Sequence, residues 1–255
     1  MFSTTIKNIH KQGTIILYPL LFDLISFLFA LAIIGFHGKP FFSIKLILEM
    51  GFPSVSHISN IPVFMHDLAL LNELNSPALT VIILAIFFLF MRVLFQGGYI
   101  GFLASIAKNE RFAVRQFFTI GRKKFVQLLL LEIIVYLLKI GLAAFFVIFF
   151  PGIGGITALF ALVAVRVVFI FIEFTLVEES VNIPKALTRS KNYYFRQFMP
   201  TSSIVILMYA VTIGLSYLLH MFWSLPLVIV MIVIYSYVMT IIQSLLMNLY
   251  QKANY

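Results

Sequence analysis

The chain has 255 residues, of which 62% are hydrophobic and 11% are charged, and its mean hydropathy is +1.07. About a quarter of the residues of a soluble domain are charged, so this composition excludes an ordinary water-soluble globular protein. The absence of cysteine excludes disulfides, thiolate metal sites and cysteine nucleophiles. The net charge of +9 does not indicate nucleic-acid binding, because the bases lie beside apolar runs, as they do in membrane proteins.

Six apolar runs are long enough to cross a hydrocarbon core of roughly 30 Å, which needs about 20 residues. We therefore predict an all-α polytopic membrane protein with six transmembrane helices and two cytoplasmic amphipathic elbow helices. It would form a single integral membrane domain over residues 1–255. The spans are predicted at 14–36, 79–106, 126–150, 153–177, 201–221 and 226–250.

The first run also resembles a signal peptide, with Ala30-Leu31-Ala32 as its cleavage site. The apolar run is long, however, continues past Ala32 and contains Asp23. We therefore favour a retained helix over a cleaved leader.

Residues 37–76 form the longest segment outside the predicted spans. The apolar patch from Phe41 to Met50 is too short to span, so it predicts an interfacial or re-entrant helix. A second weak helix is expected around His66 to Leu74. Packing over the outer helix ends is the favoured role of the segment, and binding of a partner is the alternative.

The second span contains Gln96-Gly97-Gly98-Tyr99-Ile100-Gly101, whose glycines indicate close packing of a neighbouring helix rather than a ligand site. The basic segment after it predicts the first elbow helix, with Asn109 as a candidate N-cap. The apolar stripe of this elbow has the spacing of an interfacial helix: Val114, Phe117, Phe118, Gly121 and Phe125.

The fourth span carries Arg166 and Glu173, which lie seven residues apart and so on one face of a continuous helix. The second elbow is predicted from Asn182 to Arg196. Its apolar stripe starts at Ile183 and repeats the spacing that starts at Val114, 69 residues earlier. The chain therefore has a weak indication of a duplicated unit of helix, basic elbow and helix.

Lys and Arg are unequally distributed between the two sides of this topology. The N-terminus, the two elbows and the C-terminus hold two, six, four and one of them, whereas the opposite loops hold only Lys39 and Lys45. The positive-inside rule therefore predicts a multi-pass protein of the cell (inner or plasma) membrane with both termini and both elbows in the cytoplasm.

Ionisable residues inside the spans are the strongest chemical signal. Each costs about 2.5–3.5 kcal/mol to insert at a helix centre, so exposure to lipid is disfavoured. We expect these residues to point inward as a paired network, which fixes helix register, or to line a wet cavity that binds a proton, an ion or a headgroup. They are Asp23, Arg92, Glu132, Lys139, Arg166 and Glu173.

Catalytic constellations are poor. Gly214-Leu215-Ser216-Tyr217, with His220 one turn later, resembles the Gly-x-Ser of intramembrane serine proteases, but Ser216 and His220 share one helix. No His-Glu-x-x-His motif and no Gly-rich phosphate loop occurs. We expect no catalytic residue, no metal and no cofactor, and an intramembrane enzyme is the least favoured reading.

A family resemblance lies in the second elbow. Val177-Glu178-Glu179, then Ala186-Leu187, Ser190 and Tyr193-Tyr194, resembles an acidic–x–Ala-Leu–x-x-Ser–aromatic pattern. The pattern is found in poorly characterised bacterial six-helix membrane proteins similar to the membrane domain of glycerophosphoryl diester phosphodiesterases. Asn192 stands where a Trp is common. The resemblance implies an all-helical fold in a bacterial inner membrane, but no phosphodiesterase activity, since the sequence contains no catalytic domain of that kind.

Two functions are favoured by these observations. The first is a non-catalytic membrane subunit that binds lipids, a membrane-protein partner or a second copy, and no nucleic acid. The second is a small transporter or channel component that uses the buried charges. Basic residues of the elbows are worth about 1 kcal/mol each near an anionic surface. The candidates for anionic-lipid headgroups are Arg111, Arg115, Arg122, Lys123, Lys124, Lys185, Arg189, Lys191 and Arg196.

Overall fold

The computed structural model describes residues 9, 12–45, 51–73, 78–110 and 112–254. Helices are the only regular elements of these residues, so the predicted all-α class is confirmed. The helices are α2 (Thr14–Ile34), α3 (Leu79–Ala107), α4 (Val114–Phe149), α5 (Gly154–Val168), α6 (Ile172–Glu178), α7 (Ile183–Arg196), α8 (Phe198–Met221) and α9 (Leu225–Asn254). Two short 3₁₀ helices, η1 (Val55–His57) and η2 (Leu68–Glu73), lie between α2 and α3.

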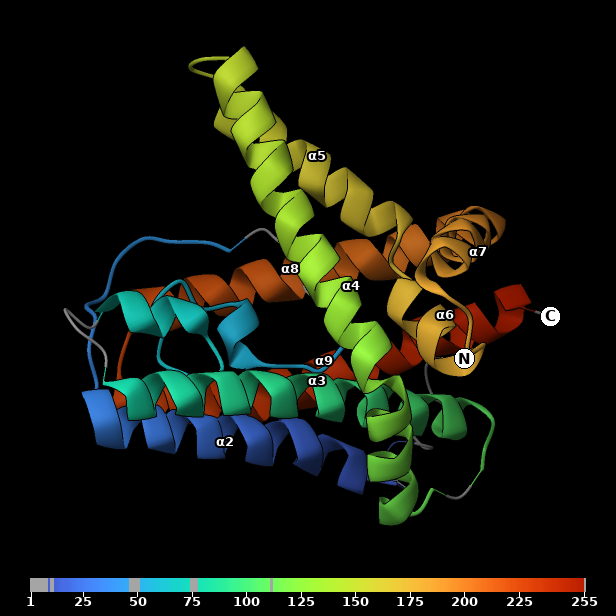
Figure 1. The fold of residues 1–255 in the computed structure, drawn as a ribbon, viewed down its shortest axis with the longest axis horizontal. Helices are drawn as coiled ribbons and strands as arrows, with labels where there is room; N and C mark the ends of the chain where they lie inside the picture. The colour runs from blue at the N-terminus through green and yellow to red at the C-terminus, as the bar shows by residue number, and fades with distance from the viewer. Residues whose placement is uncertain (1–8, 10–11, 46–50, 74–77, 111, 255) are drawn as a thin grey trace.

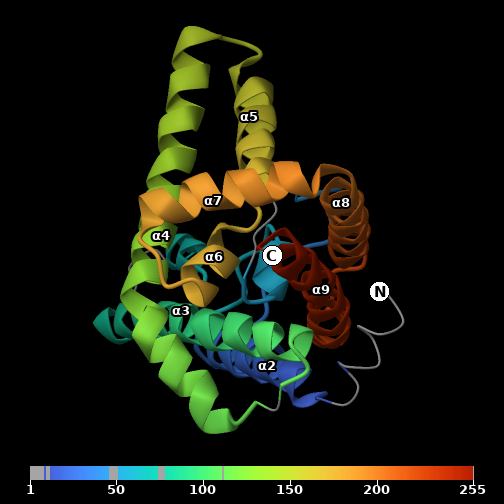
Figure 2. The same ribbon diagram turned by 90° about the vertical axis from the view of Figure 1, so that its right-hand side faces the viewer.

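Six of these segments are long and apolar enough to cross a membrane: α2, α3, α4, α5 with α6, α8 and α9. They match the six predicted spans, and the chain is a multi-pass membrane protein. Helices α2, α3, α8 and α9 pack along one another as a bundle (Figure 1). Helix α4 crosses α3 obliquely and forms a hairpin with α5 that projects from the bundle (Figures 1 and 2).

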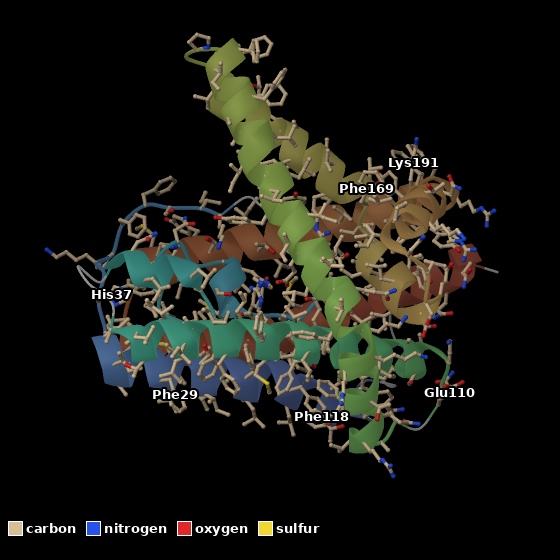
Figure 3. All side chains as sticks on the ribbon, in the orientation of Figure 1. Phe29, His37, Glu110, Phe118, Phe169 and Lys191 are labelled. Carbon is tan, nitrogen blue, oxygen red and sulfur yellow. The ribbon has the colours of Figure 1, made fainter. Side chains whose placement is uncertain are left out.

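The two ends of the bundle differ in composition. At one end, called here the basic end, α3 and α9 finish, α2 begins and α7 lies across the bundle (Figure 2). Figure 3 places Glu110 and Lys191 at this end, and His37 at the opposite end, called the loop end. The apolar side chains of α4 and α5 are largely exposed, as expected for helices that face lipid.

The predicted helix boundaries need three corrections. The first elbow is not a separate helix, because α4 continues from Val114 through the third span for 36 residues, or about 54 Å. The fourth span is broken at residues 169–171, between α5 and α6. Asn109 does not cap α4, whose N-cap is Ala113. It follows the end of α3 with a positive φ of 58°, a conformation that Asn tolerates better than most residues.

Glycines bring α3 and α4 together, as the sequence predicts. A Cβ on Gly98 would lie 2.6 Å from the carbonyl oxygen of Phe117, and one on Gly97 would lie 3.1 Å from the Cα of Gly121. A Cβ on Gly121 would overlap the carbonyl oxygen of Leu94. The two backbones therefore touch directly, and this contact fixes where the amphipathic start of α4 crosses the bundle.

The segment between α2 and α3 does not lie over the helix ends, which corrects the favoured prediction. Residues 51–59 and 61–66 are buried, and in Figure 1 this segment lies between α3 and α8. Phe52 packs its ring against Phe22 of α2 and Tyr99 of α3, at centroid distances of 5.4 and 5.7 Å. Tyr99 lies about 30 Å along α3 from its start at the loop end. We call residues 37–73 the re-entrant loop; its residues 46–50 lie outside the described part of the chain, as does most of the helix expected from Phe41 to Met50.

The α3–α4 contact generates a stability prediction. Gly121→Ala should destabilise the protein by about 1–3 kcal/mol, because a backbone carbonyl cannot make room for the added methyl group. Gly141→Ala is the matched control on the same helix, since nothing lies within 4 Å of its added Cβ. Thermal unfolding in detergent should show a lower midpoint for Gly121→Ala alone. Equal midpoints for the two variants would contradict the close contact.

Candidate functional site

The first limb of the re-entrant loop follows α8 inward from the loop end. The amide of Phe41 donates to the carbonyl of His220 at 3.2 Å, and the amide of Lys45 donates to Oγ of Ser216 at 3.1 Å. Since Ser216 precedes His220 by one helical turn, the chain descends along α8 as it proceeds. Buried hydrogen-bonding groups of α8 thereby pair with the backbone of the loop.

The second limb is held by the side chains of the same two residues. Ser216 donates its hydroxyl to the carbonyl of Ile58 at 2.8 Å, and the amide of Asn60 donates to Nε2 of His220 at 2.9 Å. His220 Nδ1 donates to the backbone carbonyl of Ser216 at 2.7 Å, so the neutral tautomer with its proton on Nδ1 satisfies both contacts. The Ser216–His220 pair of the protease-like motif is therefore occupied in anchoring the loop.

Asp23 receives the tip of the loop in the middle of α2. Its Oδ1 accepts the hydroxyl of Ser54 at 2.7 Å and its Oδ2 accepts the amide of Val55 at 2.7 Å. Asp23 and Ser54 are fully buried. Asp23 lies about 16 Å along α2 from the end at Ile34, so the loop reaches roughly the middle of the span. A charged acceptor here satisfies two donors that lipid cannot satisfy.

His66 lies against the same serine from the second limb. Its Nε2 is 3.1 Å from Oγ of Ser54 and 3.0 Å from Oγ of Ser56, and its Nδ1 is 2.8 Å from Oγ of Ser26. Because Ser54 gives its only hydroxyl proton to Asp23, it accepts from His66 and not the reverse. The four side chains Asp23, Ser54, His66 and Ser26 form one buried hydrogen-bonded chain, called here the polar centre.

The polar centre contains two titratable side chains but not the arrangement of a serine nucleophile. A serine nucleophile needs a histidine that takes its proton and a carboxylate that orients that histidine. Here the carboxylate contacts Ser54 directly, and His66 Nδ1 faces the hydroxyl of Ser26. A second proton on His66 has a partner, because Nδ1 then donates to Ser26 Oγ. Asp23 and His66 are thus two titratable groups bridged by one hydroxyl.

Four of the other predicted intramembrane charges form two ion pairs. Arg92 of α3 contacts Glu132 of α4 at 3.1 Å, and Arg166 of α5 contacts Glu173 of α6 at 2.6 Å across the break in the fourth span. Lys139 lies on α4, partly buried, seven residues beyond Glu132. Within the described residues, Oε2 of the buried Glu173 has no hydrogen-bond partner. The chain therefore brings Arg92, Glu132, Arg166 and Glu173 together two by two.

A polar stripe on α9 connects the level of the polar centre with the basic end. Its residues are buried and recur at helical spacing on one face. The hydroxyl of Tyr99, whose ring packs on Phe52 at the loop tip, donates to Thr240 Oγ1 at 3.1 Å. Several of the stripe's atoms have no partner within the described part of the chain. The stripe consists of Ser236, Thr240, Gln243 and Ser244.

Acidic residues hold the basic end together. Glu178 accepts from Lys108 at 2.6 Å and from Gln251 at 3.0 Å, and Glu179 accepts from Tyr250 at 2.8 Å and from Arg189. These carboxylates join α3, α6, α7 and α9. The acidic pair of the second elbow therefore has a clear structural role.

Neighbouring groups of α7 respond electrostatically to this acidic pair. Burial and the nearby Glu179 raise the pKa of Tyr193, whose hydroxyl donates to Asn254 at 2.8 Å. Glu179 also raises the pKa of the exposed Arg189 guanidinium. Both effects favour the protonated forms that make these contacts.

The bases proposed for lipid headgroups fall into three groups. Lys124 is buried and donates to the carbonyl of Leu176 at 2.9 Å and to Ser180 at 2.8 Å, so its inclusion as a headgroup residue was wrong. Arg189 pairs with Glu179, and Arg196 donates to the carbonyl of Ala253 at 3.0 Å. Exposed bases remain on α4 and α7, whereas Arg111 lies outside the described residues. The exposed bases are Arg115, Arg122, Lys123, Lys185 and Lys191.

No protein-family model, curated protein or solved structure matches the chain. The resemblance to the six-helix family therefore stays a prediction. Among the described residues, no three His, Asp or Glu side chains gather closely enough to hold a metal ion. What the site does must be argued from its own geometry.

Sequence reasoning found Asp23 but missed its partner Ser54, and it missed Ser56 and His66, which contact Ser54. All three lie in a segment rich in turn residues, and such a composition is typical of a surface loop. One signal was present: Val55, Ile58, Val63 and Phe64 make this segment more apolar than a solvated loop needs. The polar stripe of α9 was also missed, although its spacing is visible in the sequence.

The polar centre yields a prediction about the loop. Asp23→Ala should cost about 2–4 kcal/mol, because the hydroxyl of Ser54 and the amide of Val55 lose their buried acceptor. Asp67→Ala is the control, since that carboxylate lies at the loop surface and accepts from the amide of Ala69. The emission of Trp223, the single tryptophan, reports on the loop because its indole donates to the carbonyl of His37 at 2.9 Å. Detergent unfolding followed by this emission should shift strongly for Asp23→Ala only; equal shifts would contradict the assignment.

Proposed function

We propose that the chain is a small non-catalytic transporter or channel component that moves protons through the membrane, with Asp23 and His66 as its ionisable centre. The observation that carries the proposal is the polar centre itself: two titratable side chains bridged by Ser54 at mid-membrane depth. Ionisable residues are expensive inside a bilayer, and those that are retained usually mark ion or proton pathways.

Non-helical backbone supports the same function. Within a membrane such backbone is tolerated only where it is buried in protein or lines a water-filled cavity. The described part of the chain includes two such places, the re-entrant loop and the break at residues 169–171. Each lies beside an ionisable pair: Asp23 and His66 at the loop, and Arg166 and Glu173 at the break. Broken helices and loops of this kind supply the binding groups in many transporters.

The polar stripe on α9 supports a route for protons from the polar centre toward the basic end. Ser236, Gln243 and Ser244 each carry a buried oxygen without a hydrogen-bond partner in the described part of the chain. Such groups cost about 1–3 kcal/mol each unless water or a solute pairs with them. Further along α9 toward the basic end, Tyr250 donates to Glu179, which is partly exposed.

The membrane and the orientation belong to this proposal. The excess of Lys and Arg at the basic end supports a cytoplasmic location for that end, for both termini and for α7. We place the protein in a bacterial inner membrane on the resemblance of its second elbow. Protons would then pass between the loop end outside and the basic end inside.

A proton-flux measurement tests the function. The purified chain is reconstituted in liposomes that contain a pH-sensitive dye, and a potassium diffusion potential drives protons inward. Asp23→Asn should reduce the flux at least tenfold, because an amide accepts from Val55 but does not titrate. Asp67→Asn, the matched loop control, should conduct as the unmodified chain does. Flux from the unmodified chain equal to that of empty liposomes would overturn the proposal.

A second candidate function is a lipid- or partner-binding membrane subunit. Exposed apolar side chains beside exposed bases on α7 favour it: Phe195 and Met199 are 56% and 75% exposed, close in sequence to Lys191. This combination suits an anionic membrane surface. Native mass spectrometry from mild detergent would support it by a retained lipid, partner or second copy, and a bare monomer would count against it.

A further inference from the structure

A groove of about 320 Å³ lies between α3 and α4 on the side of the hairpin. Its walls are almost entirely apolar, and only one of its residues carries a charge. The groove is lined by Phe87, Phe90, Met91 and Leu94 of α3 and by Arg122 and Phe125 of α4. It is separate from the polar centre and plays no part in the proposed proton route.

The groove has a direction relative to the membrane. Gly121, next to Arg122, packs on Leu94, and Phe125 packs on Phe90 with a centroid distance of 5.9 Å. Arg122 therefore lies at the end nearer the basic end. From Leu94 to Phe87 the groove extends along α3 for about 10 Å toward the loop end. A cation at one end and an apolar channel that runs from it toward the loop end match the two parts of a phospholipid.

Arg122 differs from Arg92 and Arg166 in what its guanidinium contacts. Arg92 and Arg166 each contact a carboxylate, Glu132 and Glu173. Arg122 is exposed, and within the described residues no carboxylate contacts it. An anion from outside the chain is thus the complement that its position favours, and a guanidinium suits a phosphate by paired hydrogen bonds.

We propose that this groove is a binding site for one anionic phospholipid, with an acyl chain along Phe87, Phe90 and Met91 and the phosphate at Arg122. Such a lipid would contact α3 and α4 together, beside the place where their backbones touch. The site would hold the start of α4, and with it the projecting hairpin, against the bundle.

The test is native mass spectrometry of the full chain in mild detergent, titrated with phosphatidylglycerol or with phosphatidylcholine of the same acyl chains. One phosphatidylglycerol per chain should bind at lower concentration than phosphatidylcholine. Arg122→Gln should weaken phosphatidylglycerol binding about five- to tenfold, as expected for one base near an anionic headgroup.

Lys123→Gln is the matched control, because Lys123 is the next residue, is exposed and does not line the groove. It should change the affinity less than twofold. Phe90→Ala should weaken both lipids alike, since it removes groove wall and no charge. Equal losses for Arg122→Gln and Lys123→Gln would overturn the proposal in favour of diffuse attraction to the basic surface, and so would equal affinities of the two lipids.

Discussion

The absence of water in a bilayer is the constraint on which this structure depends. Every amide and carbonyl that leaves a helix inside the membrane needs a partner supplied by the protein. The re-entrant loop meets this demand through side chains of its two neighbours, Asp23 of α2 and Ser216 and His220 of α8. Lys45 adds bonds from its ammonium to the carbonyls of Ser56 and Ser59. The loop is therefore as much a part of the core as the helices are.

Hydropathy predicted the class and the six spans because each span is a long apolar run, and the signal accumulates over about 20 residues. The glycines of α3 predicted close packing of a neighbouring helix, and the structure identifies that helix as α4. The loop was misplaced because its depth is set by individual hydrogen bonds, above all those of Asp23, between residues more than 30 positions apart. Such pairings leave no periodic trace in one sequence.

The pairing of the intramembrane charges shows the same limit. Helical spacing correctly placed Arg166 near Glu173, even though the helix between them is broken and their contact crosses that break. Glu132, by contrast, contacts Arg92 of another helix, and spacing along one helix does not predict that contact. A shared helix face is thus a weaker guide than the packing of two helices, which the sequence does not reveal.

The carboxylate of Asp23 has a further implication. The loop needs an acceptor for the hydroxyl of Ser54 and the amide of Val55, and the neutral amide oxygen of an asparagine would accept a hydrogen bond without placing a charge inside the membrane. A carboxylate adds a desolvation cost that anchoring alone does not require. His66 contacts the same hydroxyl, and a second proton on its ring would have Ser26 as its partner. The feature that exceeds the needs of folding is therefore the ability to titrate, and that is what a proton pathway requires.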